Sequence, residues 1–398
     1  MEIKPPQAGL DHIRSQWSGR GTLIEALATL DPDQLWSPED VRRRLNRVLL
    51  GLVRDQVAAL PRSARRWDEA LPAETVVRRL TAAVPAGRVD YVRTRLAGWP
   101  PQSFVVRQRS RIPEELLTAA TAWTLCRLGQ VARDAKLLGS EDPKQLAPQL
   151  DAARAALELP TLSDVDRVQP HPADLVALRR AGRPWVQVAA LATAFCEAQD
   201  PTSDLFYRMI LPDPTLAGRL FQLAVTGEVL IGATRARNPL ASYRPLGMMG
   251  TGPQFASRRE LGPNLWMEAG GMWTARGIDS PYERALAGLP GAGGRPRSPD
   301  VLLEWGRRAL ILECKFSDHP SVIADGYAQV LAYAAELRLQ LFDEVTTVVV
   351  APDQIIERGQ AETHVGRVMA APAGEVSAIV TEWLTESATL QGSIPAIS

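Results

Sequence analysis

Three residues, Asp300, Glu313 and Lys315, have the types and the spacing that best suit chemistry. Lys315 is one of four lysines in a chain with 41 arginines, so a lysine here departs from a strong preference for arginine. Glu313 and Lys315 flank Cys314 in an otherwise apolar run of residues 310–316. Side chains alternate between the faces of a strand, so Glu313 and Lys315 share one face with Ile311. The sequence therefore predicts an acid and an ammonium side by side on a buried strand.

A turn at Gly306-Arg307 fixes where Asp300 lies relative to this strand. A two-residue or four-residue loop with that centre sets Asp300 opposite Glu313 on a partner strand. Directly opposed residues share a face, with Cβ atoms about 4.5 to 5.5 Å apart. Two carboxylates so placed repel each other unless a cation lies between them. We therefore expect a cation site at Asp300 and Glu313.

The chemistry that this arrangement favours is phosphodiester hydrolysis. Mg²⁺ typically takes one or two carboxylates and keeps waters or phosphate oxygens, and the carbonyl of Cys314 is a further candidate ligand. Lys315 could hold or deprotonate the attacking water, or offset charge on the phosphate. Taken singly, Asp300 would be a turn residue, and Glu313 with Lys315 a weak ion pair on a solvated strand. The joint pattern favours a metal-activated water beside a point cation.

Pro299-Asp300, twelve further residues and then Glu313-Cys314-Lys315 closely resemble the PD-(D/E)xK nuclease superfamily. The resemblance implies an α/β restriction-endonuclease-like core, a mixed sheet flanked by helices, that cuts DNA with Mg²⁺ or Mn²⁺. It implies Asp300 and Glu313 as metal ligands and Lys315 as the catalytic lysine. The next helix carries Gln329 and Tyr333 one turn apart, similar to a Gln-x-x-x-Tyr feature that orients the lysine or contacts DNA. The alternative places Tyr333 in the core and Gln329 on the helix surface.

Many members of this superfamily add an acid from the helix before the first core strand. Glu283 stands at the matching place, as a catalytic residue and metal ligand, and Glu268 is the second candidate. The plainer interpretation of Glu283 is a first-turn helix acid favoured by the helix dipole.

The same segments resemble the nuclease end of McrC-like restriction proteins. They are Tyr282-Glu283, the Pro-Asp and Glu-x-Lys strands, and the helix segment Tyr-Ala-Gln-Val-Leu-Ala-Tyr at 327–333. Arg284-Ala285-Leu286 departs from that pattern, which usually has a Trp at a set distance. McrC-like proteins act with a separate motor ATPase or GTPase. None of the four lysines here follows a glycine, so this chain carries no Walker A loop of its own.

Helical and strand-like patterns divide the chain into two expected domains. Residues 1–235 read as mostly α-helical and suit DNA or partner binding, with the clearest helices at 41–60, 114–137, 184–198 and 216–230. Residues 236–398 read as the nuclease domain. Its expected strands are 265–268, 272–274, 300–305, 309–316, 345–351 and 364–370, and its expected helices 281–289, 321–341 and 374–385.

Charge is unevenly spread in a chain with a net charge of zero. Residues 41–111 hold 16 arginines and five acidic residues. Such a segment can attract phosphate backbones, and the alternative is that these arginines line solvated helix faces. Trp67, Tyr91 and Phe104 are too scattered to predict a base-stacking platform.

The remaining signals set limits on the function. Three widely spaced cysteines predict neither a disulfide framework nor a zinc site. No apolar run reaches the ~18 residues of a membrane span, and the first residues do not resemble a signal peptide, so we expect a cytoplasmic protein.

The expected setting is bacterial restriction or anti-phage defence. A nuclease of the same fold in repair or recombination, an RNA nuclease and a non-catalytic scaffold are the alternatives, and oligomeric state stays open.

Overall fold

The computed structural model describes residues 4–16, 22–30, 36–70, 73–85, 88–98, 100–113, 115–243, 252–269, 271–278, 280, 284 and 298–392. The chain forms two compact units, one of Met1–Arg42 with Ile210–Ser398 and the other of Arg43–Met209. This division differs from the expected single boundary near residue 235. The helix Gln7–Ser15 packs against the helix Pro214–Arg235, which contacts the sheet, so both helices belong to the first unit.

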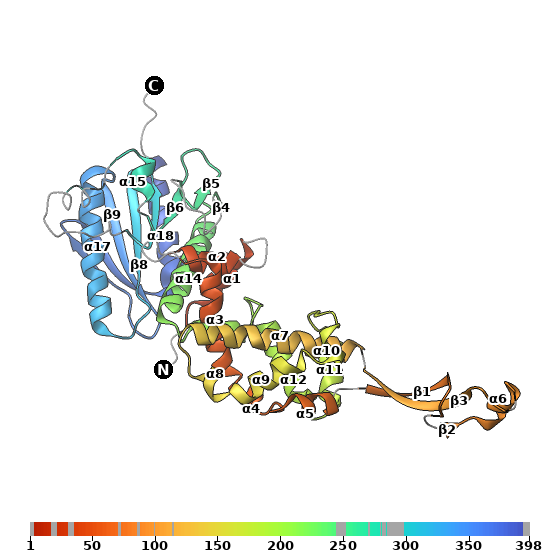
Figure 1. Cartoon of the computed structure of the whole chain (residues 1–398). Helices are drawn as coiled ribbons and strands as arrows, with labels where there is room; N and C mark the ends of the chain where they lie inside the picture. The colour runs from red at the N-terminus through yellow and green to blue at the C-terminus, as the bar shows by residue number, and fades with distance from the viewer. Residues whose placement is uncertain are drawn as a thin grey trace. The chain divides into compact units, whose positions relative to one another are not determined.

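The first unit, called the sheet unit below, is built on an eight-stranded mixed sheet in the order β10-β11-β9-β8-β7-β6-β5-β4 (Figure 1). β9 pairs in parallel with β8 and β11, and the other pairs are antiparallel. The strands are β4 (Leu240–Ser242), β5 (Phe255–Ser257), β6 (Asn264–Met267), β7 (Val301–Trp305), β8 (Arg308–Cys314), β9 (Glu344–Ala351), β10 (Gly359–Thr363) and β11 (Gly366–Pro372).

Helices cover both faces of this sheet. α17 (Pro320–Gln340) packs on one face, where its Tyr333 and Leu337 join Ile311 of β8 in a buried cluster. α14 (Pro214–Arg235) lies on the opposite face, where Phe221 contacts Phe316 with ring centroids 5.2 Å apart. α18 (Val376–Gly392) packs beside α14. The chain is therefore an α/β protein in this unit, with the faces of β8 assigned as the alternation predicted.

α14 is the central core helix of the sheet unit. It begins where the Asp213 carboxylate accepts hydrogen bonds from the backbone amides of Thr215 and Leu216. α1 (Gln7–Ser15) crosses it at Gly9 and Gly227, so closely that a Cβ on Gly227 would lie 1.8 Å from the Gly9 carbonyl oxygen. α14 is long and apolar enough to cross a membrane, but 89% of its most apolar window is buried inside the fold. That burial is typical of a core helix.

The second unit, called the helical unit below, holds most of the remaining helices and a three-stranded antiparallel sheet in the order β1-β3-β2. The strands are β1 (Ala73–Ala82), β2 (Arg88–Val89) and β3 (Phe104–Pro113). The helices are α3 (Pro38–Leu52), which begins in the sheet unit, α4 (Arg54–Ala58), α5 (Ala64–Ala70), α6 (Tyr91–Leu96), α7 (Glu115–Leu137), α8 (Asp142–Gln145), α9 (Ala147–Ala156), α10 (Pro160–Ser163), α11 (Pro172–Arg180), α12 (Trp185–Glu197) and α13 (Asp204–Ile210).

Several sequence predictions need correction. The mostly helical reading of residues 1–235 missed three strands between residues 73 and 113, where runs such as Thr75-Val76-Val77 favour strands. Residues 272–274 belong to helix α15 (Gly271–Ala275), not a strand, because Met272 and Trp273 pack into the buried cluster. β10 was not predicted. The helix expected at 281–289 lies outside the described residues except for Arg284.

Candidate functional site

The hairpin of β7 and β8 positions the acidic residues. Its register pairs Trp305 with Arg308 and Val301 with Leu312, as the Gly306 turn predicted. Gly306 has φ 61°, a left-handed conformation that glycine adopts without a steric penalty. Asp300 and Glu313 form the next step of this register, just beyond the last ladder pair. The Asp300 Oδ2 atom accepts a hydrogen bond of 2.7 Å from the Cys314 backbone amide, which holds Asp300 against the end of β8.

Lys315 lies between the sheet and α17. Its Nζ donates to Glu313 Oε1 at 2.7 Å and to Gln329 Oε1 at 2.5 Å. The Lys315 side chain is 15% exposed and that of Glu313 is 5% exposed. The Lys315 backbone amide donates to the Val350 carbonyl of β9 at 2.8 Å. The ammonium therefore has a fixed position, set by an acid of β8 and an amide of α17.

Gly326 of α17 lets the helix pass close to this lysine. A Cβ at Gly326 would lie 3.1 Å from both Cγ and Cε of Lys315 and 3.2 Å from Cγ1 of Val349. Those separations are tighter than ordinary van der Waals contacts, so a side chain there would displace Lys315 or the helix. The sequence places a glycine at the point where the lysine side chain needs the room.

Negative charge dominates the site around Asp300. Desolvation raises the pKa of the Asp300 carboxyl well above its ordinary value, and the charges of Glu313 and Glu268 raise it further. Desolvation also raises the pKa of the Cys314 thiol, again with help from Asp300 and Glu313. A divalent cation would relieve this repulsion and favour the ionised carboxylates.

Glu268 is the acid that the structure places beside Asp300. It follows β6 in a left-handed conformation, with φ 46°. Its backbone amide donates to the Asp300 carbonyl at 3.0 Å. Its carboxylate accepts hydrogen bonds from Gln222 Nε2 at 2.7 Å and from Ser298 Oγ at 3.4 Å. The second candidate for the extra acid is therefore anchored at the site, whereas Glu283 lies outside the described residues.

Gln222 of α14 is a residue that the sequence did not reveal. Its Nε2 bridges the Glu268 carboxylate and the Asp300 carbonyl, which lies 3.0 Å away. The one signal in the sequence is that this glutamine lies between Phe221 and Leu223 in an apolar helix. A buried amide needs hydrogen-bond partners, so such a glutamine points to polar groups nearby. The residues it contacts are 46 and 78 positions away in sequence, so spacing could not identify them.

The two members of the Gln-x-x-x-Tyr feature lie in different surroundings. Gln329 contacts Lys315 directly. Tyr333 is 5% exposed and lies in the buried cluster with Trp266, Leu302 and Ile311. The feature therefore brings Gln329 to the lysine, while Tyr333 packs where α17 meets the sheet.

A few of the described residues could act as donors to a metal ion. No three side chains of His, Cys, Asp or Glu form a ready-made ligand group in this part of the chain. Asp300, Glu313 and Glu268 are the carboxylates at the site, and Cys314, whose carbonyl is a further candidate ligand, follows Glu313 in sequence. Such a donor set fits Mg²⁺, which keeps several waters, better than it fits a metal that requires a closed protein cage.

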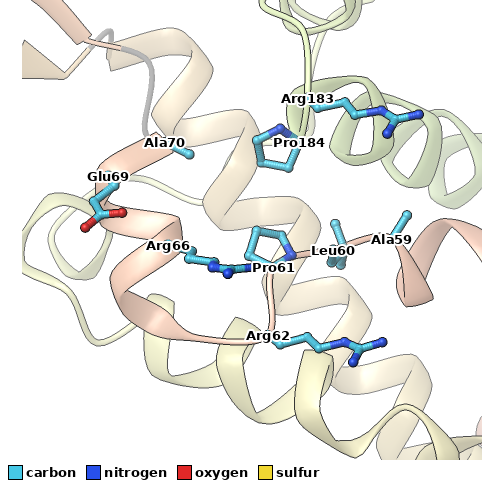
Figure 2. Close-up of a pocket in the computed structure, with 9 residues that line it drawn as sticks. All are labelled: Ala59, Leu60, Pro61, Arg62, Arg66, Glu69, Ala70, Arg183 and Pro184. Atoms are coloured by element: carbon cyan, nitrogen blue, oxygen red, sulfur yellow. The ribbon is translucent and has the colours of Figure 1, made fainter.

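The helical unit contains a different kind of site. A surface pocket of about 540 Å³ lies between the segment from Ala59 to Ala70 and the turn at Arg183 and Pro184. Figure 2 shows the residues that line it. Arg62, Arg66 and Arg183 contribute cations to its lining, and Glu69 contributes the single acid. It lacks the paired acids of the β7–β8 site, so it offers no comparable site for a metal ion.

Comparisons with known proteins give little more. No protein-family model and no curated protein matches the chain. Among solved structures, the chain is similar to part of a half-complex of Thermococcus gammatolerans McrB AAA+ hexamers with bound McrC. That match has a TM-score of 0.25 and 11% identity, and covers 86% of this chain and 68% of that one. This hint of a relationship to a restriction system is weak, and a TM-score this low carries no argument about fold or activity.

Proposed function

We propose that this chain is a metal-dependent nuclease of the PD-(D/E)xK type, with a restriction-endonuclease-like core, that hydrolyses DNA phosphodiester bonds. The observation that carries the proposal is the cluster of Asp300, Glu313 and Lys315 at one end of the β7–β8 hairpin. An isolated ion pair on a strand would not need a second, desolvated acid beside it. Together the three groups provide cation ligands and a fixed ammonium at one point.

Each residue has a distinct role in this proposal. Asp300 and Glu313 would hold Mg²⁺ or Mn²⁺ with the Cys314 carbonyl, and the ion would supply Lewis acidity and an acidified water. Glu268, anchored by Gln222, is the extra acid that the described residues offer. Lys315 donates to a water or a phosphate oxygen and stabilises the charge that develops on the phosphate. Gln329 keeps the Lys315 ammonium in place.

The proposed setting is a bacterial restriction or anti-phage defence system. The resemblance of the Pro299-Asp300 and Glu313-Cys314-Lys315 segments to McrC-like proteins is the ground for proposing a separate motor subunit as a partner. The arginine-rich segment of the helical unit would contribute sequence-independent attraction for DNA.

The first experiment measures cleavage by the purified full-length chain. Supercoiled, linear and single-stranded DNA and RNA are incubated with Mg²⁺, with Mn²⁺ and with EDTA. We expect metal-dependent cleavage of DNA, and a rate lower by about 100-fold or more in Lys315→Ala. Lys144→Ala is the matched control, because Lys144 is an exposed lysine of the helical unit. A Lys315→Ala protein that cuts as well as the parent would contradict the assigned role.

A second readout does not depend on a motor partner. Isothermal titration with Mn²⁺ measures metal binding by the chain alone. We expect binding by the parent, a loss in Asp300→Asn, and no change in Lys144→Ala. Parent protein that binds no Mn²⁺ and cuts no nucleic acid would identify the chain as a non-catalytic scaffold.

A further inference from the structure

A groove between α7 and α9 of the helical unit combines an apolar floor with cationic edges. Its volume is about 670 Å³, within the usual range of roughly 300 to 1,000 Å³ for ligand pockets. We call it the α7–α9 groove. Leu125 and Leu128 of α7 and Ala153 of α9 are buried in its floor, and Leu150 and Leu157 are half-buried. The half-buried Leu150 and Leu157 supply the aliphatic surface that a ligand can cover.

Five cations line the α7–α9 groove against one acid, Asp151. All five are exposed: Arg133, Lys136, Lys144, Arg154 and Arg167. Two of the four lysines of the whole chain therefore line this one groove. The single acid cannot neutralise the five cations, so the groove attracts an anionic ligand.

The cations of the groove are largely available to a ligand. Among the residues that the structure describes, no carboxylate forms an ion pair with Arg133 or Lys136, and Arg167 donates only to the Cys126 thiol, at 3.7 Å. Lys144 pairs with Glu141 at 2.8 Å and Arg154 with Asp151 at 3.8 Å. Both of these pairs are exposed to solvent, where an ion pair contributes little and is readily exchanged.

We propose that the α7–α9 groove docks an acidic amphipathic helix of a partner protein. The aliphatic floor receives the apolar stripe of such a helix, and the cations on either side receive its flanking carboxylates. This inference does not depend on nuclease activity at the β7–β8 site.

Nucleic acid fits this groove less well than a protein helix. None of the residues that line it is aromatic, and single-stranded bases bind chiefly by stacking on aromatic rings. A phosphate backbone would satisfy the cations but leave the half-buried Leu150 and Leu157 without an apolar partner. An acidic helix satisfies both.

The test uses two synthetic peptides of about 18 residues, because shorter helices are marginal in water. Both repeat leucine at positions i, i+3, i+4 and i+7. One carries glutamate beside the leucine stripe and the other carries lysine. Fluorescence anisotropy measures their binding to the full-length chain at low salt. We expect the acidic peptide to bind at least about tenfold more tightly than the basic one.

Gly129 provides a matched pair of variants for the groove. It lines the groove, and nothing lies within 4 Å of a Cβ built on it, so a side chain is accommodated without a clash. Gly129→Trp fills the groove without changing charge, and we expect it to weaken acidic-peptide binding at least about tenfold. Gly129→Ala should bind like the parent. Circular dichroism of both variants checks the fold.

A second pair of variants tests the charge. Arg133→Glu with Lys136→Glu should remove peptide binding, whereas Arg47→Glu with Arg180→Glu, at exposed positions away from the groove, should retain it. Equal binding of the two peptides, or unchanged binding by Gly129→Trp, would overturn the proposal. The proposal would also fail if a single-stranded oligonucleotide lost its binding in Gly129→Trp but did not displace the acidic peptide from the parent. The groove would then hold the oligonucleotide and not the peptide. A dimer of the chain that Gly129→Trp dissociates would assign the groove to self-association instead.

Discussion

Two lysine–glutamate ion pairs, one in each unit, have almost the same length and very different surroundings. Lys315 and Glu313 of the sheet unit lie 2.7 Å apart, with side chains 15% and 5% exposed. Lys144 and Glu141 of the helical unit lie 2.8 Å apart, with side chains 73% and 66% exposed. Solvent screens the Lys144–Glu141 pair. The Lys315–Glu313 pair is shielded from solvent, and Gln329 accepts a further hydrogen bond from Lys315.

The difference separates two uses of charge. In the sheet unit, acids and a lysine are brought out of water and fixed relative to one another, which is the condition for preorganised chemistry. In the helical unit, cations remain exposed above an apolar floor, which suits attraction of a separate partner. The two ion pairs therefore provide a direct comparison. Removal of Lys315 leaves the buried Glu313 without its partner, whereas removal of Lys144 leaves the exposed Glu141 without its partner.

The largest expected effect is on the buried pair. Lys315→Met should destabilise the sheet unit by about 3 kcal/mol, because it leaves Glu313 buried without its cation. Lys144→Met should change stability by less than about 0.5 kcal/mol. Urea unfolding of the full-length chain measures both.

A double-mutant cycle sharpens this result. Adding Glu313→Gln to Lys315→Met removes the uncompensated charge and should recover part of the lost stability, with a coupling energy of roughly 1 to 3 kcal/mol. The corresponding cycle at Glu141 and Lys144 should give a coupling near zero. Similar coupling in the two cycles would show that burial does not distinguish the pairs.

The sequence predicted the β7–β8 site because its determinants are local. Alternation along β8 and the turn at Gly306 fix which residues share a face, and the structure confirms both. The same reasoning predicted the helix at α17 and the strand at β9 that follows it. These features depend on periodicity over a few residues.

The features that the sequence did not reveal depend on distant contacts. Gln222 reaches Glu268 and Asp300 only because α14 folds onto the sheet. The strands at 73–113 lie in a segment whose arginines mask the β-branched pattern, and the unit boundaries follow packing of residues 1–42 against the sheet unit. Contacts between segments that are far apart in sequence leave no recognisable spacing in the chain.

Two helical glycines give the next comparison, again one in each unit. Gly129→Ala in α7 should stabilise the protein by roughly 0.5 to 1 kcal/mol, because alanine favours helix and open space surrounds the new methyl group. Gly326→Ala in α17 meets Lys315 and Val349 at 3.1 to 3.2 Å. Crowding there should exceed the helix gain and cost about 1 kcal/mol.

Thermal unfolding measures the stability of the two glycine variants, and Mn²⁺ binding reports on the β7–β8 site. Gly326→Ala should also weaken Mn²⁺ binding or DNA cleavage by displacing Lys315, while Gly129→Ala leaves both unchanged. A stabilised Gly326→Ala protein with parental activity would show that the close approach of α17 does not constrain the lysine.

The smallest expected effect comes from two acids whose pKa values move in opposite directions. Desolvation raises the pKa of Glu228 on α14, against hydrogen bonds from Ser377 and Gly9. In the helical unit, the backbone amide of Arg93 and the nearby Arg107 lower the pKa of Asp90. A raised carboxyl pKa means that the folded state holds the proton more tightly than the unfolded chain does. Glu228 should therefore make stability fall as pH rises from about 4.3 through its folded pKa.

Asp90 should act with the opposite sign, because a lowered carboxyl pKa adds stability above the unfolded value. That contribution is lost as pH falls from about 3.9 through the folded pKa. Melting temperatures of the parent, Glu228→Gln and Asp90→Asn across this acidic range measure both slopes. As pH rises, the stability of the parent should fall relative to that of Glu228→Gln. Over the same range it should rise relative to that of Asp90→Asn. Slopes of the same sign in the two comparisons would mean that desolvation does not set the pKa of Glu228, and would weaken the same argument for Asp300, where desolvation is also the first cause.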